Sequence, residues 1–240
     1  MVNGISNANL GKPDYDKALD QHAKYIEALK TCDLDVTVLP ADEDYPDSCF
    51  VEDTALLTPN VAIITNPGAE SRKGEVHKMK ELVKGFYDDV EEIKEPGTVE
   101  AGDIMMVEDH YYIGLSKRTN LKGALQLLAI LKKYEFTGTM VNLNEFLHLK
   151  TGLSYLEEAN LLVCGKFISN PTFEEFIRIE VPEDEAYAAN CVWINGKVLI
   201  PSGYSKTSNK IVAAAYEIIE VDMSEFQKLD GGLSCLSLRF

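Results

Sequence analysis

Residues 189–200 read Ala-Asn-Cys-Val-Trp-Ile-Asn-Gly-Lys-Val-Leu-Ile. Two apolar runs flank Asn195-Gly196, and an Asn-Gly pair between apolar runs is a strong hairpin signal because a type I′ turn needs a positive φ at both central positions. A helical pattern follows over 208–217. The segment therefore predicts two antiparallel strands followed by a helix.

This hairpin recurs at three earlier places in the chain, and a helix follows it at the first two. A small or acidic residue stands near the start of each first strand, and a short polar turn separates the two strands. The predicted strands and helices are 49–57, 61–64 and 72–86; 100–107, 111–113 and 120–134; and 153–156 and 161–163. Repeats of roughly forty to fifty residues that share a core predict a ring of α/β units.

The two ends of the chain are predicted to complete a fifth unit. Residues 231–240 have the pattern of its first strand, whereas Pro13–Cys32 has the pattern of an amphipathic helix and 35–39 that of a strand. Termini that meet in one unit close a ring, which leaves a central cavity where strand ends converge. The alternative is an ordinary α/β protein whose hairpins and helices alternate without a ring.

The composition excludes several classes of protein. With 45% hydrophobic and 26% charged residues, the 240-residue chain has the composition of a globular domain. No apolar run is long enough to span a bilayer, and Met1–Gly4 lacks the features of a secretory signal, so we expect a cytoplasmic protein that does not bind membranes. The formal net charge of −16 disfavours nucleic acid and favours a cationic small molecule.

The cysteines and histidines do not predict a disulfide framework or a metal site. The five cysteines are odd in number, and none stands in a C-x-x-C motif. No pair of His, Cys or carboxylate side chains has the spacing of zinc ligands on one helix or hairpin. We therefore expect neither a metal ion nor another cofactor.

Nucleophilic and acid–base groups fall at equivalent places in the repeats, just before or inside the first strand. These groups are Glu52 and Asp53, Glu100 and Asp103, His148, and Cys235. A ring would bring them to one opening. There a thiolate could attack a cationic carbon, an imidazole could move protons, and carboxylates could hold a guanidinium by bidentate hydrogen bonds.

Each of these residues also has a plain structural interpretation. A cysteine in an apolar strand is commonly a buried packing residue, and Cys49, beside the first acidic pair, is a rival nucleophile. Residues 100–103 could be only an acidic turn before a strand. The pair Gly231-Gly232 favours Cys235, because glycines beside a strand permit close approach of the backbone to a ligand.

Eight short motifs extend these observations over nearly the whole chain. They are LGKPDY (Leu10–Tyr15), FVED (Phe50–Asp53), PGAESR (Pro67–Arg72), GTVEAGD (Gly97–Asp103), GLSKRTN (Gly114–Asn120), LHLKTG (Leu147–Gly152), AANC (Ala188–Cys191) and DGGLSC (Asp230–Cys235). Through these motifs the chain resembles the bacterial dimethylarginine dimethylaminohydrolases, within the superfamily of guanidine-modifying enzymes that includes arginine deiminases and amidinotransferases.

The resemblance implies a fold and a set of residue roles. The family fold is the pentein fold, a five-bladed α/β propeller of ββαβ repeats whose termini share one blade, so 1–240 would form a single catalytic domain. Cys235 would be the nucleophile, His148 the general acid and base, and Glu100 the residue that orients the imidazole. The implied substrate ligands are Asp53, Glu52 and Asp47 for the guanidinium, Arg72 and Arg118 for the α-carboxylate, the backbone near Ile5 for the α-amino group, and Asp230.

The implied reaction is hydrolysis of asymmetric dimethylarginine or monomethylarginine to L-citrulline and dimethylamine or methylamine, through a covalent cysteine thiouronium. An arginine deiminase and a non-catalytic arginine-binding homologue are the alternatives. Family members begin with a strand upstream of the loop at Met1–Gly4 that this sequence does not contain, so one blade is expected to lack a strand. The resemblance also implies a homodimer.

Overall fold

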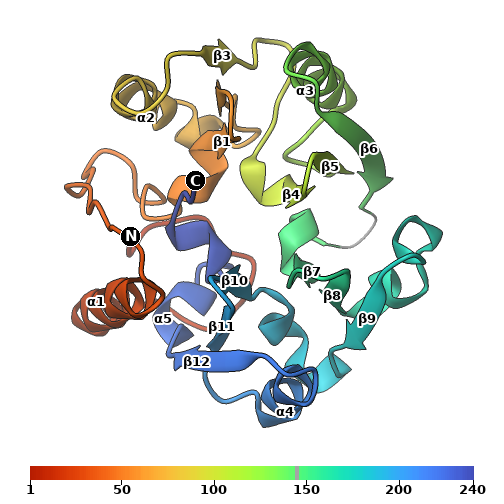
Figure 1. Ribbon diagram of the computed structural model, residues 1–240. Coiled ribbons are helices and arrows are strands. Elements are labelled where there is room, and N and C mark those ends of the chain that lie inside the picture. The colour runs from red at the N-terminus through yellow and green to blue at the C-terminus, as the bar shows by residue number, and fades with distance from the viewer. Residues whose placement is uncertain (144–145) are drawn as a thin grey trace. The chain divides into compact units, whose positions relative to one another are not determined.

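Over residues 1–143 and 146–240, which the computed structural model describes, the strands form four three-stranded sheets of one topology (Figure 1). In each sheet the first two strands form an antiparallel hairpin, and the third pairs parallel to the second. The strands are β1 (Ala55–Leu57), β2 (Ala62–Ile64) and β3 (Val90–Glu92); β4 (Ile104–Val107), β5 (His110–Leu115) and β6 (Thr137–Asn142); β7 (Leu153–Tyr155), β8 (Asn160–Val163) and β9 (Ile177–Glu180); and β10 (Val192–Ile194), β11 (Lys197–Pro201) and β12 (Glu217–Val221).

The hairpins predicted from the sequence are confirmed at all four places. Asn195 and Gly196, between β10 and β11, have φ angles of 47° and 85°, the positive values that a two-residue type I′ turn requires. A third strand parallel to the second needs a crossover connection, which is commonly a helix. The helices are α1 (Tyr15–Thr31), α2 (Val76–Val83), α3 (Leu121–Lys133), α4 (Ser205–Ala213) and α5 (Ser224–Gln227).

Contacts divide the chain into two compact units. Unit 1 comprises 1–47 and 152–234, and unit 2 comprises 48–151 and 235–240. In unit 2, α3 buries Ala124, Leu127 and Leu131 against a core shared with β2, β4 and β5. In unit 1, α1 packs against α5 and β12, so an early segment and a late one lie side by side (Figure 1). The single catalytic domain over 1–240 stays a prediction.

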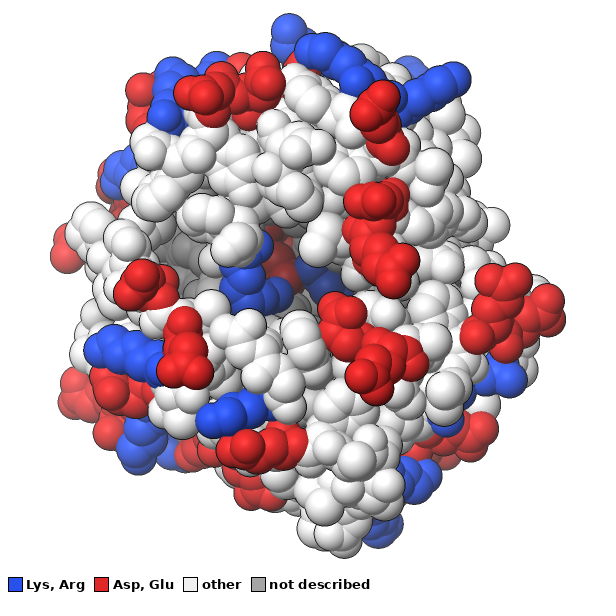
Figure 2. Space-filling model, in the orientation of Figure 1, with Lys and Arg blue, Asp and Glu red and all other residues white. Residues whose placement is uncertain are grey.

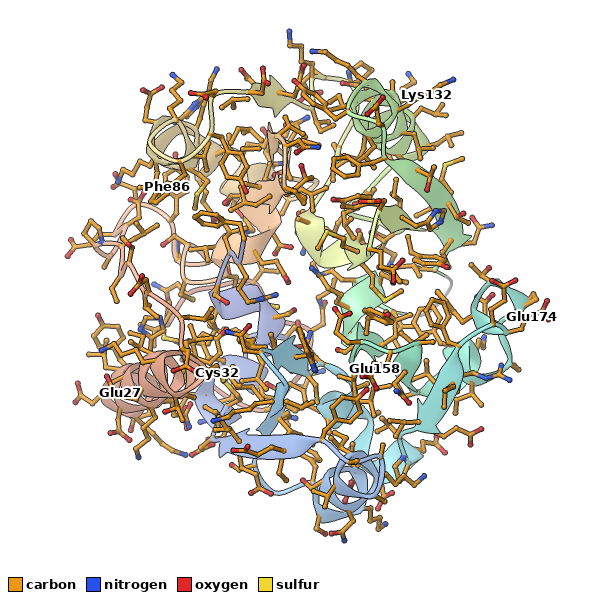
Figure 3. All side chains as sticks on the ribbon, viewed as in Figure 1. Glu27, Cys32, Phe86, Lys132, Glu158 and Glu174 are labelled. Carbon is orange, nitrogen blue, oxygen red and sulfur yellow. The ribbon has the colours of Figure 1, made fainter. Side chains whose placement is uncertain are left out.

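The long helices have the caps and polar faces that their sequences predict. Asp14 and Asn120 accept hydrogen bonds from the backbone N–H groups three residues later and so begin α1 and α3. Glu27 and Lys132 are exposed on the outer sides of these helices (Figure 3). No helix within the described residues combines the length and apolar character needed to cross a membrane.

A short 3₁₀ turn precedes the first strand of every sheet. The turns are η1 (Val51–Thr54), η3 (Ala101–Asp103), η4 (Leu149–Thr151) and η7 (Glu183–Ala189), and η8 (Ser234–Leu236) lies near the end of the chain. Between β8 and β9 two further 3₁₀ turns, η5 (Gly165–Ser169) and η6 (Pro171–Phe173), stand where the other sheets have a helix, and η2 (Glu70–Arg72) precedes α2. The repeated unit is therefore a 3₁₀ turn, a hairpin, a crossover and a parallel strand.

Two predicted strands were wrong. Residues 35–39 are not assigned to a strand, and Cys235 lies in the 3₁₀ turn η8 instead of a strand over 231–240. The apolar alternation of these segments is compatible with a strand, but a strand forms only where a neighbouring strand supplies the ladder of hydrogen bonds.

Two helix boundaries were also wrong. The helix predicted over 208–217 begins earlier, as α4, because the Glu185 carboxylate accepts hydrogen bonds from the backbone N–H groups of Lys206 and Thr207. It ends before Ala215, whose φ of 68° lies in the left-handed region. The helix predicted over 72–86 is shorter, as α2, because η2 occupies its start.

Candidate functional site

Three buried polar side chains of unit 2 converge on one point. One potential ligand atom from each of Asp53, Glu100 and His148 lies within 4.8 Å of the other two. Asp53 belongs to η1, Glu100 immediately precedes η3, and His148 immediately precedes η4. The repeated 3₁₀ turn therefore brings to one place residues that are far apart in the sequence.

Glu100 holds the imidazole of His148. One carboxylate oxygen, Oε2, lies 2.8 Å from His148 Nε2, and the other, Oε1, accepts from the backbone N–H of Ala69 at 3.1 Å and from Arg118 Nη1 at 3.3 Å. Glu100 has no exposed surface. A carboxylate fixed on both oxygens fixes in turn the orientation of the ring that it binds.

Both carboxylate oxygens of Asp53 accept hydrogen bonds, as those of Glu100 do. Its Oδ1 accepts from the backbone N–H of Gly102 at 3.0 Å, and its Oδ2 accepts from Arg72 Nη1 at 2.5 Å. A Cβ atom added at Gly102 would lie 2.9 Å from Asp53 Oδ1 and 3.0 Å from the imidazole of His148. Only glycine therefore fits between these two side chains.

The protonation states of the cluster follow from its charges. Burial alone would lower the pKa of His148, but the nearby charge of Asp53, the hydrogen bond with Glu100 and the charge of Asp103 raise this pKa to about 9. Burial alone would raise the pKa of Asp53, but the charges of His148 and Arg72 lower it. At neutral pH His148 is therefore an imidazolium beside the ionised carboxylate of Asp53.

Arg72 binds Asp53 from a buried position. Its Nη2 donates to the Phe50 carbonyl at 2.8 Å, and its Nε and Nη2 bind the Glu75 carboxylate at distances between 2.8 and 3.1 Å. Arg118 pairs with Glu100 and its side chain is 17% exposed. Arg118 is thus the more accessible of the two arginines predicted to bind a substrate carboxylate.

Glu52 is ion-paired on the neighbouring side of η1. Its Oε1 accepts from Lys150 Nζ at 2.6 Å, and Arg239 Nη2 lies 3.6 Å from the same oxygen. The Glu52 side chain is 4% exposed. Its predicted contact with a guanidinium would therefore be made in the presence of cationic groups from η4 and from the C-terminal segment.

The remaining predicted substrate ligands belong to unit 1. Asp47 is 5% exposed and its Oδ1 accepts from the backbone N–H of Ile5 at 2.9 Å. The Asp230 carboxylate accepts from the backbone N–H of Asn7 at 2.6 Å. A Cβ atom added at Gly4 would lie 2.5 Å from Asp47 Oδ1. The two aspartates therefore hold the N-terminal loop that contains Ile5.

The cysteines differ in burial and ionisation. Cys235 and Cys49 are partly exposed, and both belong to unit 2. Burial raises the pKa of the Cys164 thiol to about 11, and it also raises the pKa of Cys191 and of Cys32. These three thiols are poor nucleophiles at neutral pH. Cys235 lies in η8, so it occupies the same kind of turn as Asp53.

The cluster of Asp53, Glu100 and His148 is the group of described residues that could in principle hold a metal ion. Its donor atoms do not favour one. The Glu100 carboxylate is already paired with Arg118. The Asp53 carboxylate is already neutralised by Arg72. The arrangement is better suited to proton transfer.

A cavity of about 960 Å³ lies elsewhere in unit 2. It is lined in part by Phe86, Tyr87 and Phe240. The ring of Phe240 contacts the rings of the other two, and Figure 3 places Phe86 beside α2. None of its lining residues is a predicted catalytic or substrate-binding residue. The convergence of charged groups, and not the volume of this cavity, therefore locates the candidate site.

Sequence reasoning missed two supporting residues. Gly102 stands inside the GTVEAGD motif, and its lack of a side chain was a signal that could have been used. Glu75, which binds Arg72, gave no signal, because it lies outside the motifs in a predicted helix where an exposed glutamate is ordinary.

Comparison with known proteins agrees with this geometry. The chain matches the model of the family "N,N dimethylarginine dimethylhydrolase, eukaryotic" over residues 9–237. It is 58% identical over 241 residues to a dimethylarginine dimethylaminohydrolase of Pseudomonas aeruginosa, a match that covers 100% of this chain and 95% of the relative. A protein of the same name from Streptomyces coelicolor is 33% identical over 237 residues, covering 98% of this chain and 90% of that protein.

Comparison with solved structures also finds a dimethylarginine dimethylaminohydrolase. The chain matches a Pseudomonas aeruginosa dimethylarginine dimethylaminohydrolase, a cysteine-to-serine variant complexed with citrulline, with a TM-score of 0.99 and 58% identity over 100% of this chain and 94% of that one. This match confirms the predicted fold class, an α/β fold of repeated small sheets. The chain belongs to the dimethylarginine dimethylaminohydrolase family.

Proposed function

We propose that this protein hydrolyses Nω-methylated L-arginine to L-citrulline and an amine, with Cys235 as nucleophile. The observation that carries the proposal is the buried group of Asp53, Glu100 and His148 in a chain that is 58% identical to a dimethylarginine dimethylaminohydrolase. The net charge of −16 supports a cationic substrate, and groups of Asp and Glu side chains, with Lys and Arg side chains among them, are scattered over the face shown in Figure 2.

The proposed reaction divides one displacement into two. The Cys235 thiolate adds to the guanidinium carbon, and the C–N bond to the methylated nitrogen breaks as His148 gives its proton to the departing amine. A covalent thiouronium remains. His148, now neutral, takes a proton from water, the resulting hydroxide adds to the same carbon, and the C–S bond breaks to release citrulline and the thiolate.

The supporting residues have distinct proposed tasks. Glu100 keeps the imidazole oriented and favours its charged form, as its hydrogen bond with His148 supports. Asp53 and Glu52, with Asp47, would bind the guanidinium, because their buried carboxylates can accept charge-assisted hydrogen bonds. Arg118 and Arg72 would pair with the α-carboxylate, and Arg72 has the further task of holding Asp53. The loop at Ile5, tied by Asp47 and Asp230, would meet the α-amino group.

Product analysis tests the proposal directly. Citrulline release should be measured side by side from asymmetric dimethylarginine, monomethylarginine and arginine, with dimethylamine quantified for the first. Release from the methylated substrates supports the proposal. Release from arginine alone would identify an arginine deiminase, and calorimetric binding without product would identify an arginine-binding protein.

The raised pKa of His148 predicts an alkaline limit on activity. His148 must be protonated to act on the leaving amine, and its pKa in the free protein is about 9, so kcat/KM should fall above about pH 9. The substrate's own amino group titrates in the alkaline range as well. We therefore expect ¹³C-histidine NMR to show one imidazole, absent from His148→Asn, that titrates near pH 9. Titration of that signal below pH 7 would contradict the proposed proton donor.

Gly102→Ala should reduce activity more than it reduces stability. The added methyl group would meet Asp53 Oδ1 at 2.9 Å and the His148 ring at 3.0 Å, so both side chains must move. A displacement of about 1 Å can cost roughly 100-fold in rate, and we expect a kcat loss of that order. Gly196→Ala is the control, since nothing lies within 4 Å of its added Cβ; it should affect stability only. Equal kcat values for the two variants would refute the prediction.

We make further proposals about the location, the oligomeric state and the cofactor requirement of the protein. Location in the cytoplasm is supported by five cysteines that are all free. A homodimer stays a prediction that sedimentation equilibrium can test. No cofactor is needed for the steps above, because the nucleophile and the proton donor are both side chains.

A further inference from the structure

A second buried carboxylate lies under the turn that carries His148. Asp103 has no exposed surface, and its Oδ1 accepts from the backbone N–H of Leu149, the residue after His148, at 3.0 Å. Its Oδ2 accepts from Ser116 Oγ at 2.7 Å. A Cβ atom added at Gly114 would lie 3.1 Å from both Asp103 Oδ1 and the Leu149 Cβ, so this glycine leaves the space that the contact occupies.

The Ser116 hydroxyl donates its hydrogen bond to Asp103. Ser116 Oγ accepts from the backbone N–H groups of Arg118 and Thr119, at 2.9 and 3.1 Å. Its own proton is therefore available for the carboxylate, and its lone pairs are used by the loop. Asp103 thus connects the turn before β4, the loop after β5 and the start of η4 in one set of hydrogen bonds.

We propose that Asp103 is a positioning residue for His148, because its carboxylate binds the backbone of the turn that carries the imidazole and places a negative charge beside it. The inference rests on the proposed function. Asp103 is not a predicted substrate ligand; it would act only through His148. Its effect would be to fix where the imidazole stands and to keep it protonated until the amine leaves.

Of the three carboxylates around His148, Asp103 is the one for which no cationic partner other than His148 is described above. Asp53 comes from η1, Glu100 immediately precedes η3, and Asp103 is the last residue of η3. Asp53 is also neutralised by Arg72, and Glu100 shares its charge with Arg118. Asp103 receives only neutral donors among the hydrogen bonds described above, from Ser116 and Leu149. Its negative charge is therefore available to the imidazolium.

Asp103→Asn separates charge from shape. Asparagine has nearly the same shape and its Oδ1 can still accept from Leu149 N–H, so the turn that carries His148 keeps its contact while the charge and the bond from Ser116 are lost. We expect the pKa of the His148 imidazole, followed by ¹³C NMR, to fall by about one pH unit. The alkaline limb of kcat/KM should move by the same amount. At about pH 9, where the variant imidazole would be mostly neutral, we expect kcat to fall about fivefold relative to wild type, with KM changed less than about threefold.

Asp109→Asn is the matched control. Asp109 follows β4 as Asp103 precedes it, but it is exposed, so this variant removes the same charge from the same hairpin. It should leave the His148 titration and kcat unchanged. If Asp103→Asn folds and the His148 titration does not move, Asp103 has only a structural role and the proposal fails.

The wild-type protein supplies a test that needs no variant. Burial raises the pKa of Asp103 to about 6, against the opposing effects of His148 and of its hydrogen-bond donors. The His148 ¹³C signal should therefore show a second inflection near pH 6, when the neighbouring carboxylate takes up a proton. Absence of any second inflection on the acid side of the imidazole titration overturns the inference even if Asp103→Asn does not fold. Because the titration is independent of turnover, failure of the proposed function would appear separately, as absence of citrulline.

Discussion

Cys235→Ser is expected to abolish citrulline release from asymmetric dimethylarginine, with a loss of at least about 10⁴ in kcat. A serine hydroxyl is not ionised at neutral pH, whereas the reaction needs a thiolate that adds to carbon and later departs from it. The side chain is partly exposed in η8, and oxygen replaces sulfur at almost constant shape. The folded state should therefore persist, and the melting temperature should change little.

Cys49→Ser is the matched control for this substitution. Cys49 is the other partly exposed cysteine of unit 2 and stands just before η1. We expect Cys49→Ser to retain turnover, and a covalent adduct formed during turnover to appear by mass spectrometry on the peptide that contains Cys235. If Cys49→Ser loses turnover and Cys235→Ser retains it, Cys49 is the nucleophile and the proposed role of Cys235 is wrong.

The sequence predicted the hairpins and the convergence of the cluster for one physical reason. Local alternation and turn residues define each hairpin, and Asp53, Glu100 and His148 each lie in, or immediately before, the 3₁₀ turn that precedes the first strand of their sheet. Residues at equivalent places in successive repeats come to one edge of a repeat structure. The place of these residues in the repeat was therefore sufficient to predict their convergence, although the turns η1 and η3 were predicted to be parts of strands.

Features that depend on distant partners were not predictable in this way. The start of α4 is set by Glu185, about twenty positions upstream, and the two segments at 35–39 and 231–240 have strand patterns without strand structure. The burial of Arg72 was missed for the same reason. The family resemblance implied only that Arg72 pairs with a substrate carboxylate, whereas Asp53, Glu75 and the Phe50 carbonyl bind its guanidinium.

Arg72→Met is expected to have the largest effect on stability. The substitution leaves the carboxylates of Asp53 and Glu75, whose side chains are 4% and 3% exposed, without the cation that both bind. Removal of one partner from a buried ion pair costs about 3–5 kcal/mol of unfolding free energy. Lys73→Met, at the next position, is the control; Lys73 pairs at the surface with Glu70 and Glu95, and such pairs contribute roughly 0–1 kcal/mol.

The pH dependence of unfolding distinguishes loss of this ion pair from a packing defect. Because the pKa of Asp53 is lowered in the folded state, with Arg72 among the causes, Asp53 contributes stability above its unfolded pKa of about 3.8. That contribution is lost as the pH falls through the folded value. Urea unfolding at pH 7 and at pH 3 should therefore show a smaller difference between Arg72→Met and wild type at pH 3. An equal loss at both pH values would show that the methionine disturbs packing and that the ion pair contributes little.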